Sequence, residues 1–469
     1  MSEGARRRVA IAGASGFIGR ALLARLTPAH EAIALARRVE GQPAGPGVEW
    51  RACDLFNLLD AERALVGADV AVYLVHSMMP SARLTQGRFD DLDLICADNF
   101  ARAAAANGVR HIVYLGGLLP ASGEALSRHL ESRFEVERTL GAHGVPVTTL
   151  RAGLIIGAGG SSFDMMARLV GRLPFMIGPL WTRSLTQPIA LDDAVTLLEF
   201  AVGRPDLAGR AYDVGGPDVV SYAEMLRMTG AAQGKRTRVV TLPVRTARLS
   251  LWWVSAITGA SQALVLPLVE SLRHDMVASD GLVLQKEAGL NACSLRLALE
   301  QASREGAPRG RAGPSAPAPA RTAAVARACS VQRLRVRPGK NAAQVAEEYV
   351  AWLPRFLRSL LRVSVDSAKR CQFYLGPLRK PLLVLQHAPD RSSPDRQLFY
   401  VEGGLLCGEA AGARPRLEFR SVLDGAYVLA AVHDFVPRLP WFLYKYTHAL
   451  VHLWVMRAFS RHLAAEARP

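Results

Sequence analysis

Cysteine is scarce in this sequence, and no two cysteines are spaced for metal binding. The six cysteines lie far apart, and no Cys-x-x-Cys motif is present. Paired cysteines are the usual sign of a zinc site or a disulfide scaffold, so we expect neither here. The first eight residues lead directly into an apolar run and do not form the h-region of a signal peptide. We therefore expect no metal site and a reducing, cytoplasmic location.

Lysine is also scarce, and no basic run is longer than the three arginines of residues 6–8. The formal net charge of +16 and the pI of about 10.1 come mostly from arginines that are spread along the whole chain. Proteins that bind nucleic acid gather their cations into a patch or stripe. The distribution therefore indicates a solvated basic surface, and we expect no nucleic-acid partner.

Long uncharged runs are rare, and the most notable one covers residues 249–269. This run is long enough to span a bilayer, but Ser, Thr, Gly, Gln and Pro residues interrupt it. Two buried helices joined near Gly259 are favoured for this reason, and a membrane-associated hairpin is the alternative. Peripheral association with the inner face of a membrane thus stays open.

The first half of the chain alternates short apolar strands with helical patterns. Such alternation is typical of a parallel sheet that is covered on both faces. It predicts a Rossmann-type, doubly wound α/β domain over residues 1–300, with a substrate-facing lobe from about residue 160. The expected strands are 9–12, 32–36, 48–52, 70–75, 111–115, 147–151 and 212–214, and the clearest helices are 99–106 and 132–140.

A second domain is expected at the C-terminus, after a linker rich in Pro, Ala and Gly at residues 301–328. Residues 329–469 contain a helical pattern at 342–361, several strand patterns between 333 and 432, and one long terminal helix at 441–463. Strands closed by a long helix predict an α+β domain in which an antiparallel sheet surrounds that helix.

An apolar strand, a glycine-rich turn and the start of a helix follow one another near the N-terminus. The turn reads Gly13-Ala14-Ser15-Gly16-Phe17-Ile18-Gly19. Glycine permits a turn too tight for a Cβ atom, and the N–H groups at a helix N-terminus can bind phosphate. A structural strand-to-helix turn is the alternative to dinucleotide binding. The residues expected to contact the pyrophosphate are Gly13, Ser15, Gly16, Phe17, Ile18 and Gly19.

The ends of the next strands offer further contacts for a dinucleotide. Arg37 and Arg38 follow the second strand, where an acid would favour NAD and an arginine pairs with the 2′-phosphate of NADP. NADP(H) is therefore favoured over NAD(H), although two surface arginines are the alternative. The other candidates for cofactor contact follow the third and fourth strands and are Asp54, Leu55, Val75 and His76. For His76, a packing or capping role is the alternative to cofactor contact.

Several motifs together resemble those of the extended or atypical short-chain dehydrogenase/reductases. The resemblance covers residues 8 to about 290 and implies a Rossmann-type fold that binds NAD(P)H. Residues 73–78, 114–118 and 129–133 are similar to a subgroup with a C-terminal domain of unknown function, usually of the ligand-binding helix-grip fold, and residues 329–469 resemble that domain in outline. Besides the glycine turn, the motifs are Cys53-Asp54-Leu55, Leu150-Arg151-Ala152-Gly153, Gln187-Pro188-Ile189-Ala190-Leu191-Asp192-Asp193-Ala194 and Asp213-Val214-Gly215-Gly216-Pro217.

The chain departs from this family at the residues that carry catalysis. A typical member uses a Tyr as proton donor, a Lys four residues later, and a Ser after the fifth strand. Aligned on that pattern, His129 stands at the tyrosine, Arg133 at the lysine, and Gly116 or Gly117 at the serine. A histidine with a pKa near about 6.5 can act as a general acid, and arginine can still donate to a ribose. His129 and Arg133 are thus candidate catalytic residues, with structural or cofactor-positioning roles as the alternative.

The resemblance also makes Arg183 and Gln187 candidate substrate contacts, with surface or packing roles as the alternative. The leading hypothesis is an NADP(H)-binding atypical reductase-like protein that transfers hydride to a small apolar carbonyl or quinone-type compound. The second is a non-catalytic module that binds NADPH in a structural or redox-sensing role, in a respiratory or membrane assembly.

Overall fold

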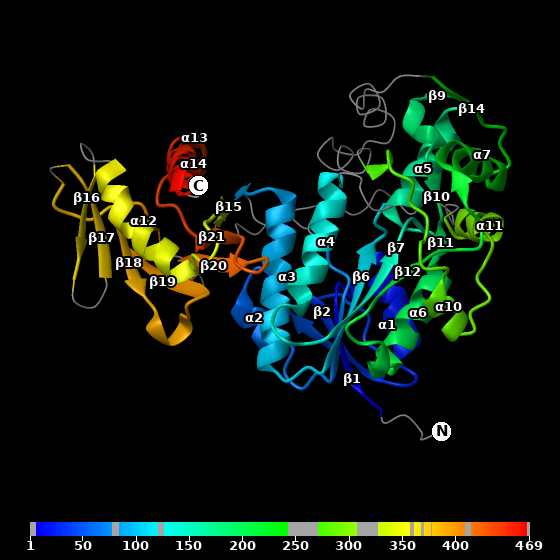
Figure 1. Cartoon of the computed structure of the whole chain (residues 1–469), viewed down its shortest axis with the longest axis horizontal. Coiled ribbons are helices and arrows are strands. Elements are labelled where there is room, and N and C mark those ends of the chain that lie inside the picture. The colour runs from blue at the N-terminus through cyan, green and yellow to red at the C-terminus, as the bar shows by residue number, and fades with distance from the viewer. Residues whose placement is uncertain are drawn as a thin grey trace. The chain divides into compact units, whose positions relative to one another are not determined.

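The computed structural model describes residues 6–76, 84–120, 126–242, 271–306, 327–356, 361–366, 370–376, 378–408 and 414–466. The uncharged run 249–269 and most of the expected linker 301–328 lie outside these ranges. The chain forms two compact units (Figure 1). The first consists of Met1–His76 and Ala97–Gly313, and the second of Ser77–Cys96 and Pro314–Pro469.

The first unit is built on a parallel seven-stranded sheet with the strand order β12-β7-β6-β4-β1-β2-β3. The chain order reverses between β1 and β4, which is the switch point where Rossmann-type folds bind their dinucleotide. This confirms the fold class expected from the alternating pattern. The strands are β1 (Arg8–Ala12), β2 (Glu31–Ala36), β3 (Val48–Ala52), β4 (Val70–Tyr73), β6 (His111–Gly117), β7 (Val147–Ala152) and β12 (Ala211–Val214).

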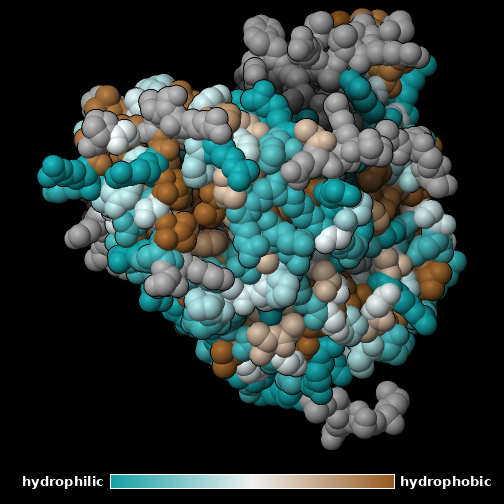
Figure 2. All heavy atoms as spheres, turned by 60° about the vertical axis from the view of Figure 1, so that its left-hand side comes forward, coloured by the Kyte–Doolittle hydropathy of each residue, from teal (hydrophilic) through white to brown (hydrophobic). Residues whose placement is uncertain are grey.

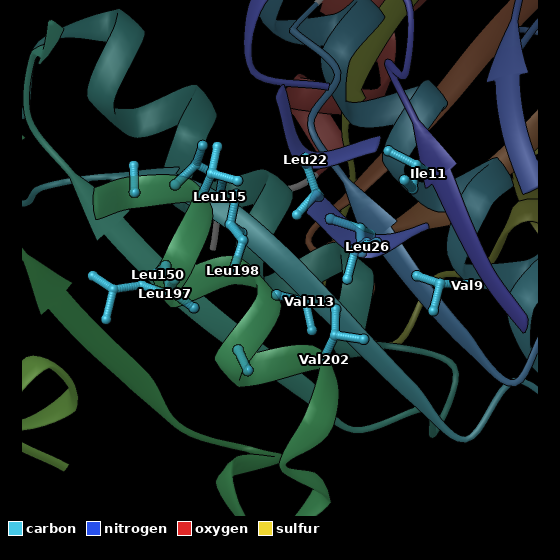
Figure 3. Packing of buried hydrophobic residues seen from close by; sticks show 14 of the residues in the cluster. Val9, Ile11, Leu22, Leu26, Val113, Leu115, Leu150, Leu197, Leu198 and Val202 are labelled. Atoms are coloured by element: carbon cyan, nitrogen blue, oxygen red, sulfur yellow. The ribbon is translucent and has the colours of Figure 1, made fainter. Parts of the chain in front are cut away.

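Helices cover both faces of this sheet. Leu22 and Leu26 of α1 (Phe17–Leu26) and Leu197 and Leu198 of α6 (Leu191–Gly203) pack against strand residues such as Val113 (Figure 3). On the other face, α3 (Phe89–Ala106) and α4 (Arg128–Gly141) contact the strands: the Phe100 ring lies 5.0 Å from that of Tyr73, and the Tyr114 hydroxyl donates to the Arg133 carbonyl. Helix α2 (Leu58–Ala64) follows β3. Such cover explains why the inner strands, such as β4 (VAVY), are mostly apolar.

A lobe with its own apolar core completes the first unit. Phe163, Met176, Met225 and Leu299 lie in this core. The elements between β7 and the end of the lobe, β12 excepted, are β8 (Ile155–Ile156), α5 (Ser161–Arg172), β9 (Phe175–Gly178), η1 (Leu180–Arg183), β10 (Leu185–Thr186), β11 (Ile189–Ala190), α6, η2 (Pro205–Leu207), β13 (Val220–Ser221), α7 (Tyr222–Ala232), β14 (Arg238–Thr241), α10 (Val283–Glu287) and α11 (Leu295–Glu305).

The second unit contains seven antiparallel strands and one strand from far earlier in the chain. Its sheet has the order β16-β17-β18-β19-β20-β21-β15-β5. The elements are β5 (Leu84–Gln86), β15 (Ala328–Arg335), α12 (Ala342–Phe356), β16 (Leu361–Val365), β17 (Arg370–Leu375), β18 (Leu383–His387), η3 (Pro389–Arg391), β19 (Arg396–Gly403), β20 (Arg416–Val422), β21 (Tyr427–Phe435), α13 (Trp441–Tyr446) and α14 (His448–Glu466).

One face of this sheet packs on α12 and α14. Tyr349 of α12 and Phe459 of α14 have ring centroids 5.0 Å apart, and both lie in one core with Phe419 of β20. The expected α+β domain with an antiparallel sheet around a terminal helix is therefore confirmed. Its terminal helix differs from the expectation of one unbroken segment, because Thr447 leaves the helical conformation and separates α13 from α14.

Strand β5 is the largest difference from the expected organisation. It pairs in parallel with β15, and the Gln332 side-chain amide donates to the Gln86 carbonyl. Asp91, at the start of α3, accepts a hydrogen bond of 2.7 Å from Arg333. Residues 77–96 thus group with the second unit, although the sequence alone assigns them to the first.

The part of the chain that the structure describes contains no helix that is both long and apolar enough to cross a membrane. On the face drawn in Figure 2, hydrophilic residues predominate, and apolar residues gather in small patches between them.

Candidate functional site

The glycine turn lies between β1 and α1, at the carboxyl end of β1, which is next to the central strand β4. Gly13 has a φ of +89°, which favours glycine, and its carbonyl accepts a hydrogen bond of 2.9 Å from the Gly16 N–H. A Cβ atom on Gly19 would stand only 2.1 Å from the Gly13 carbonyl oxygen, so only glycine allows this close packing. Gly16 is the N-cap of α1, no side chain caps the helix, and its first turn contains no acid. The positive end of the helix dipole therefore faces a backbone cradle that suits a pyrophosphate.

The ends of β2 and β3 lie beside this cradle in the sheet. Arg37 and Arg38 directly follow β2, and both side chains are exposed. After β3, Asp54 accepts from the Phe56 N–H at 3.1 Å, and the buried Asn99 amide donates to the Leu55 carbonyl at 2.7 Å. Asn99 therefore fixes the backbone of a predicted cofactor loop. Sequence reasoning missed this role, although a polar residue within an apolar helix stretch is a usable signal.

Two histidines from distant parts of the sequence meet at the carboxyl end of the sheet. His76 follows Val75 just after β4, and His129 lies in the first turn of α4. Their ring centroids are 5.0 Å apart, and the rings meet edge to face at 64°. Ser127 is the N-cap of α4 and accepts from the Leu130 N–H, which fixes the start of the helix on which His129 stands.

Arg133 lies one helical turn after His129 and is fixed to β6. Its Nη2 donates to the Leu115 carbonyl at 2.7 Å, and its guanidinium lies over the Tyr114 ring, 5.3 Å from the ring centroid. Its Nη1 is buried and has no hydrogen-bond partner among the described residues. A buried donor of this kind costs free energy until it is satisfied, so it suits a bound oxygen such as a ribose hydroxyl.

The positions expected for a serine are both glycines at the end of β6. A Cβ atom on Gly117 would have only ordinary contacts, the nearest being Arg133 Cγ at 3.7 Å, whereas one on Gly116 would lie 3.0 Å from the Tyr114 ring. Space therefore exists for a side chain at Gly117, but the chain has no hydroxyl there.

The two candidate substrate contacts have different surroundings. Gln187 is buried: its side-chain amide donates to the Gly216 carbonyl at 2.7 Å and accepts from the Ala278 N–H at 3.0 Å. Both ends of this amide bind backbone, so Gln187 holds two loops together. Arg183 ends η1, and its side chain is exposed.

Two polar groups that the sequence analysis missed hold the neighbouring strands. Arg151 of β7 forms a two-pronged ion pair with Glu137 of α4, at 3.0 and 2.6 Å. Asp213 of β12 is buried and accepts from the N–H and the hydroxyl of Ser279, at 2.8 and 2.7 Å. Arg151 and Asp213 both stand in motifs that carry the family resemblance, so the motifs themselves offered a signal.

The fold and this glycine cradle define a Rossmann-type dinucleotide-binding protein. Residues 13–161 match the model of a family described as NAD(P)H-binding. The first unit thus contains a segment similar to NAD(P)H-binding domains, and it has the fold of solved epimerase- and reductase-like proteins.

Relatives of known name share parts of this chain. Auxiliary protein GraX of Staphylococcus aureus is 32% identical over 145 residues, which are 30% of this chain and 43% of that protein. The chain therefore matches less than half the length of this relative. A reductase of Streptomyces griseus named for (4-alkanoyl-5-oxo-2,5-dihydrofuran-3-yl)methyl phosphate is 29% identical over 247 residues, 52% of this chain and 80% of that one.

Among solved structures, the NADPH-dependent quinone oxidoreductase QOR2 of Escherichia coli, complexed with NADPH, superposes with a TM-score of 0.50. Its sequence identity is 19%, and the match covers 62% of this chain and 98% of that one. At this identity the match establishes the fold of the first unit only.

Proposed function

We propose that this protein is an NADP(H)-dependent reductase of a small apolar carbonyl or quinone-type compound. The observation that carries the proposal is the contact between His76 and His129 at the carboxyl end of the parallel sheet. In open α/β sheets this edge is where ligands bind. A pair of imidazoles there supplies a proton donor in a domain that binds NAD(P)H.

The residues of the first unit fit the cofactor. The N–H groups at Phe17 and Ile18 would hold the pyrophosphate, because the glycine turn brings backbone where a Cβ atom would clash. Arg37 and Arg38 would pair with the 2′-phosphate, and Asp54 and Leu55 would border the adenine. The buried Nη1 of Arg133 would donate to the nicotinamide ribose. NADPH, when bound, supplies the hydride.

His129 would supply the proton to the developing alkoxide or quinol oxygen from a ring nitrogen. Imidazole is the side chain best suited to proton transfer near neutral pH. The His76 ring meets the His129 ring edge to face, and Ser127 holds the start of the helix on which His129 stands. Arg133 cannot donate a proton to the reaction because guanidinium does not titrate in this range, so its role is to position.

The names of the relatives support a reductase with a small-molecule substrate. One is a reductase of an acyl-furanone methyl phosphate, and one neighbour in fold reduces quinones with NADPH. The six cysteines form no disulfide among the described residues, which is consistent with the proposal that the protein acts in a reducing compartment.

A second candidate function is a module that binds NADPH without turning it over. The observation that favours it is the pair of glycines, Gly116 and Gly117, where a catalytic serine would polarise a carbonyl. An oxyanion donor of that kind often contributes several kcal/mol to catalysis.

The test is NADPH oxidation by the full-length chain with a panel of aldehydes, ketones and quinones. We expect turnover with at least one compound, and we expect His129→Ala to lower kcat at least 100-fold while NADPH affinity changes less than threefold. His387→Gln, a histidine of the second unit that bonds Gln397, is the matched control and should keep wild-type activity. Tight NADPH binding without turnover would replace the reductase by the binding module, and no NADPH binding would contradict both.

A further inference from the structure

Strands β9 and β14 present an apolar surface to solvent at the outer side of the lobe. They pair in parallel, with Phe175 opposite Arg238 and Ile177 opposite Val240. Met176 and Val239 point into the lobe core and are buried. The alternating residues therefore share the outer face, where Phe175, Ile177 and Val240 are 53%, 52% and 44% exposed. Leu242, two residues beyond Val240, is 41% exposed.

Single exposed apolar residues are ordinary, but the outer face of a solvated strand pair is normally polar. Here the strand register puts three large apolar side chains next to one another, and the remaining partner is an arginine. An apolar cluster of this kind, bordered by charge, marks an interaction surface.

The charge around these strands has one sign. No acidic residue occurs between Asp164 and Asp192, or between Glu224 and Glu270, and these two stretches contain both strands. Among the described residues, six exposed arginines stand in them: Arg168, Arg172, Arg183, Arg227, Arg236 and Arg238.

The described acids that bound these stretches stand at the helix ends away from the two strands or are already bonded, as Asp192 is to Arg25. Asp164 and Glu224 stand in the first turns of α5 and α7, whereas β9 and β14 follow the other ends of these helices. Asp275 accepts from the Leu185 N–H. Lys235 caps α5 by donating to the Gly171 carbonyl, but Arg236 and Arg238 lie beyond that cap.

We propose that this surface, the β9–β14 face (Phe175, Ile177, Val240 and Leu242 with Arg236 and Arg238), docks on a lipid membrane with anionic headgroups. Apolar side chains that enter the headgroup region and cations beside them are the combination that binds peripheral proteins to such membranes. A second copy of this chain fits the face less well, because a two-fold contact would place the arginines of both copies against each other and their like charges would repel.

The experiment is co-sedimentation of the chain with two kinds of vesicle. One is phosphatidylcholine alone, and the other is phosphatidylcholine in which about a third of the lipid is the anionic phosphatidylglycerol. We expect binding to the anionic vesicles only, and a large loss at high salt because exposed charges are then screened. Phe175→Ser with Ile177→Ser should weaken the binding at least tenfold, and so should Arg236→Gln with Arg238→Gln.

A matched control uses apolar residues that are equally exposed elsewhere. Leu450→Ser with Trp454→Ser alters α14 of the second unit, where these residues are 53% and 49% exposed, and should leave vesicle binding unchanged. NADPH binding and the thermal midpoint verify that every variant is folded. The proposal would be overturned if the wild-type chain sedimented equally with both vesicle types or with neither. It would also be overturned if a folded face variant bound vesicles like wild type, or if only the α14 variant lost binding. A concentration-dependent dimer that the face variants abolish, without vesicle binding, would also overturn it.

Discussion

The central strands of the two sheets differ in where their polar residues stand. In the first unit, β4 and the part of β1 after Arg8 are apolar and buried, and candidate-site residues such as His76 follow these strands at their carboxyl ends. In the second unit, polar residues stand within the strands. On β20, Leu417 and Phe419 pack into the core with α12 and α14, while Glu418 alternates with them and is also buried.

Glu418 is the centre of a buried charge cluster. Arg396 donates to it at 2.5 Å, Arg420 donates to it from two nitrogens, and His433 Nε2 lies 3.6 Å away. Burial alone would raise the pKa of Glu418, but the charges of Arg420 and Arg396 hold it well below its usual range. The contrast separates a buried charge cluster with a structural role from the candidate site, whose polar residues lie at the carboxyl edge of the parallel sheet.

Removal of the Glu418 charge should produce the largest effect. Glu418→Gln leaves the Arg396 and Arg420 guanidinium groups buried with less compensation, and loss of one partner in a buried ion pair costs about 3–5 kcal/mol. We expect this loss in the free energy of unfolding of the second unit, measured by urea denaturation. Glu402→Gln is the control, because Glu402 forms an exposed pair with Arg370 and should change stability by less than about 1 kcal/mol. Equal effects of the two changes would contradict a structural role for the cluster.

A side chain at Gly19 should damage the first unit next most strongly. The Cβ atom of Gly19→Ala would meet the Gly13 carbonyl oxygen at 2.1 Å, so the turn must move. We expect a loss of about 3 kcal/mol, at the upper end for overpacking, together with loss of NADPH binding in a fluorescence titration. Gly203→Ala, where an added Cβ atom would meet nothing within 4 Å, should bind NADPH as wild type does. Normal NADPH affinity in Gly19→Ala would refute the cradle.

Arg37 and Arg38 should decide between the two cofactors. The double change Arg37→Ala with Arg38→Ala removes charge-assisted hydrogen bonds to a 2′-phosphate, worth about 2 kcal/mol, or about 30-fold in affinity. We expect that loss for NADPH and less than a twofold change for NADH, measured by calorimetry. Arg63→Ala, which changes an exposed arginine on α2, should alter neither. An equal loss of affinity for both cofactors would show that the two arginines do not bind the 2′-phosphate of NADPH.

Mild acid should weaken the second unit through His433. Burial and the nearby Arg416 lower the pKa of His433 to about 3, so the folded state binds fewer protons than the unfolded state between pH 6.5 and 3. The free energy of unfolding therefore falls by about 1.4 kcal/mol for each pH unit below about 6.5. Burial raises the pKa of Asp91 to about 6, which acts in the opposite direction below that pH.

Urea denaturation at pH 7.5, 6.0 and 5.0 tests the contribution of His433. In His433→Gln, the proton that His433 takes up on unfolding no longer contributes to the dependence of the unfolding free energy on pH. The variant should therefore lose less stability between pH 6 and 5 than the wild type. His387→Gln, which changes a part-buried histidine of the same unit, should keep the wild-type slope. The same slope in the His433 variant would assign the acid sensitivity to other groups.

The elements that local pattern determines could be predicted from the sequence. The parallel strands follow from short apolar runs, and the glycine turn follows from glycines at a strand-to-helix junction. Strand β5 could not be predicted, because three residues show no periodicity and their partner, β15, lies more than 240 residues later in the chain. The break at Thr447 could not be predicted either, since the helical pattern continues across it.

The candidate residues could be named one by one from the sequence, but their arrangement could not. His76 and His129 each follow from a motif position, but their contact depends on how β4 and α4 pack. Gln187 was expected to touch substrate, and its surroundings became visible only with the loops at Gly216 and Ala278 in place. Tertiary contacts of this kind have no local sequence signal.

The most direct test of the central claim is a thermal-shift titration of the wild-type chain with NADPH and with NADH. A ligand that binds only the folded state adds about 2.7 kcal/mol of stability at 100 times its Kd. We predict a Tm that rises steadily with NADPH and rises comparably only at far higher NADH concentrations. A Tm that does not respond to NADPH, or that responds equally to both, would contradict an NADP(H) site at the edge of the parallel sheet.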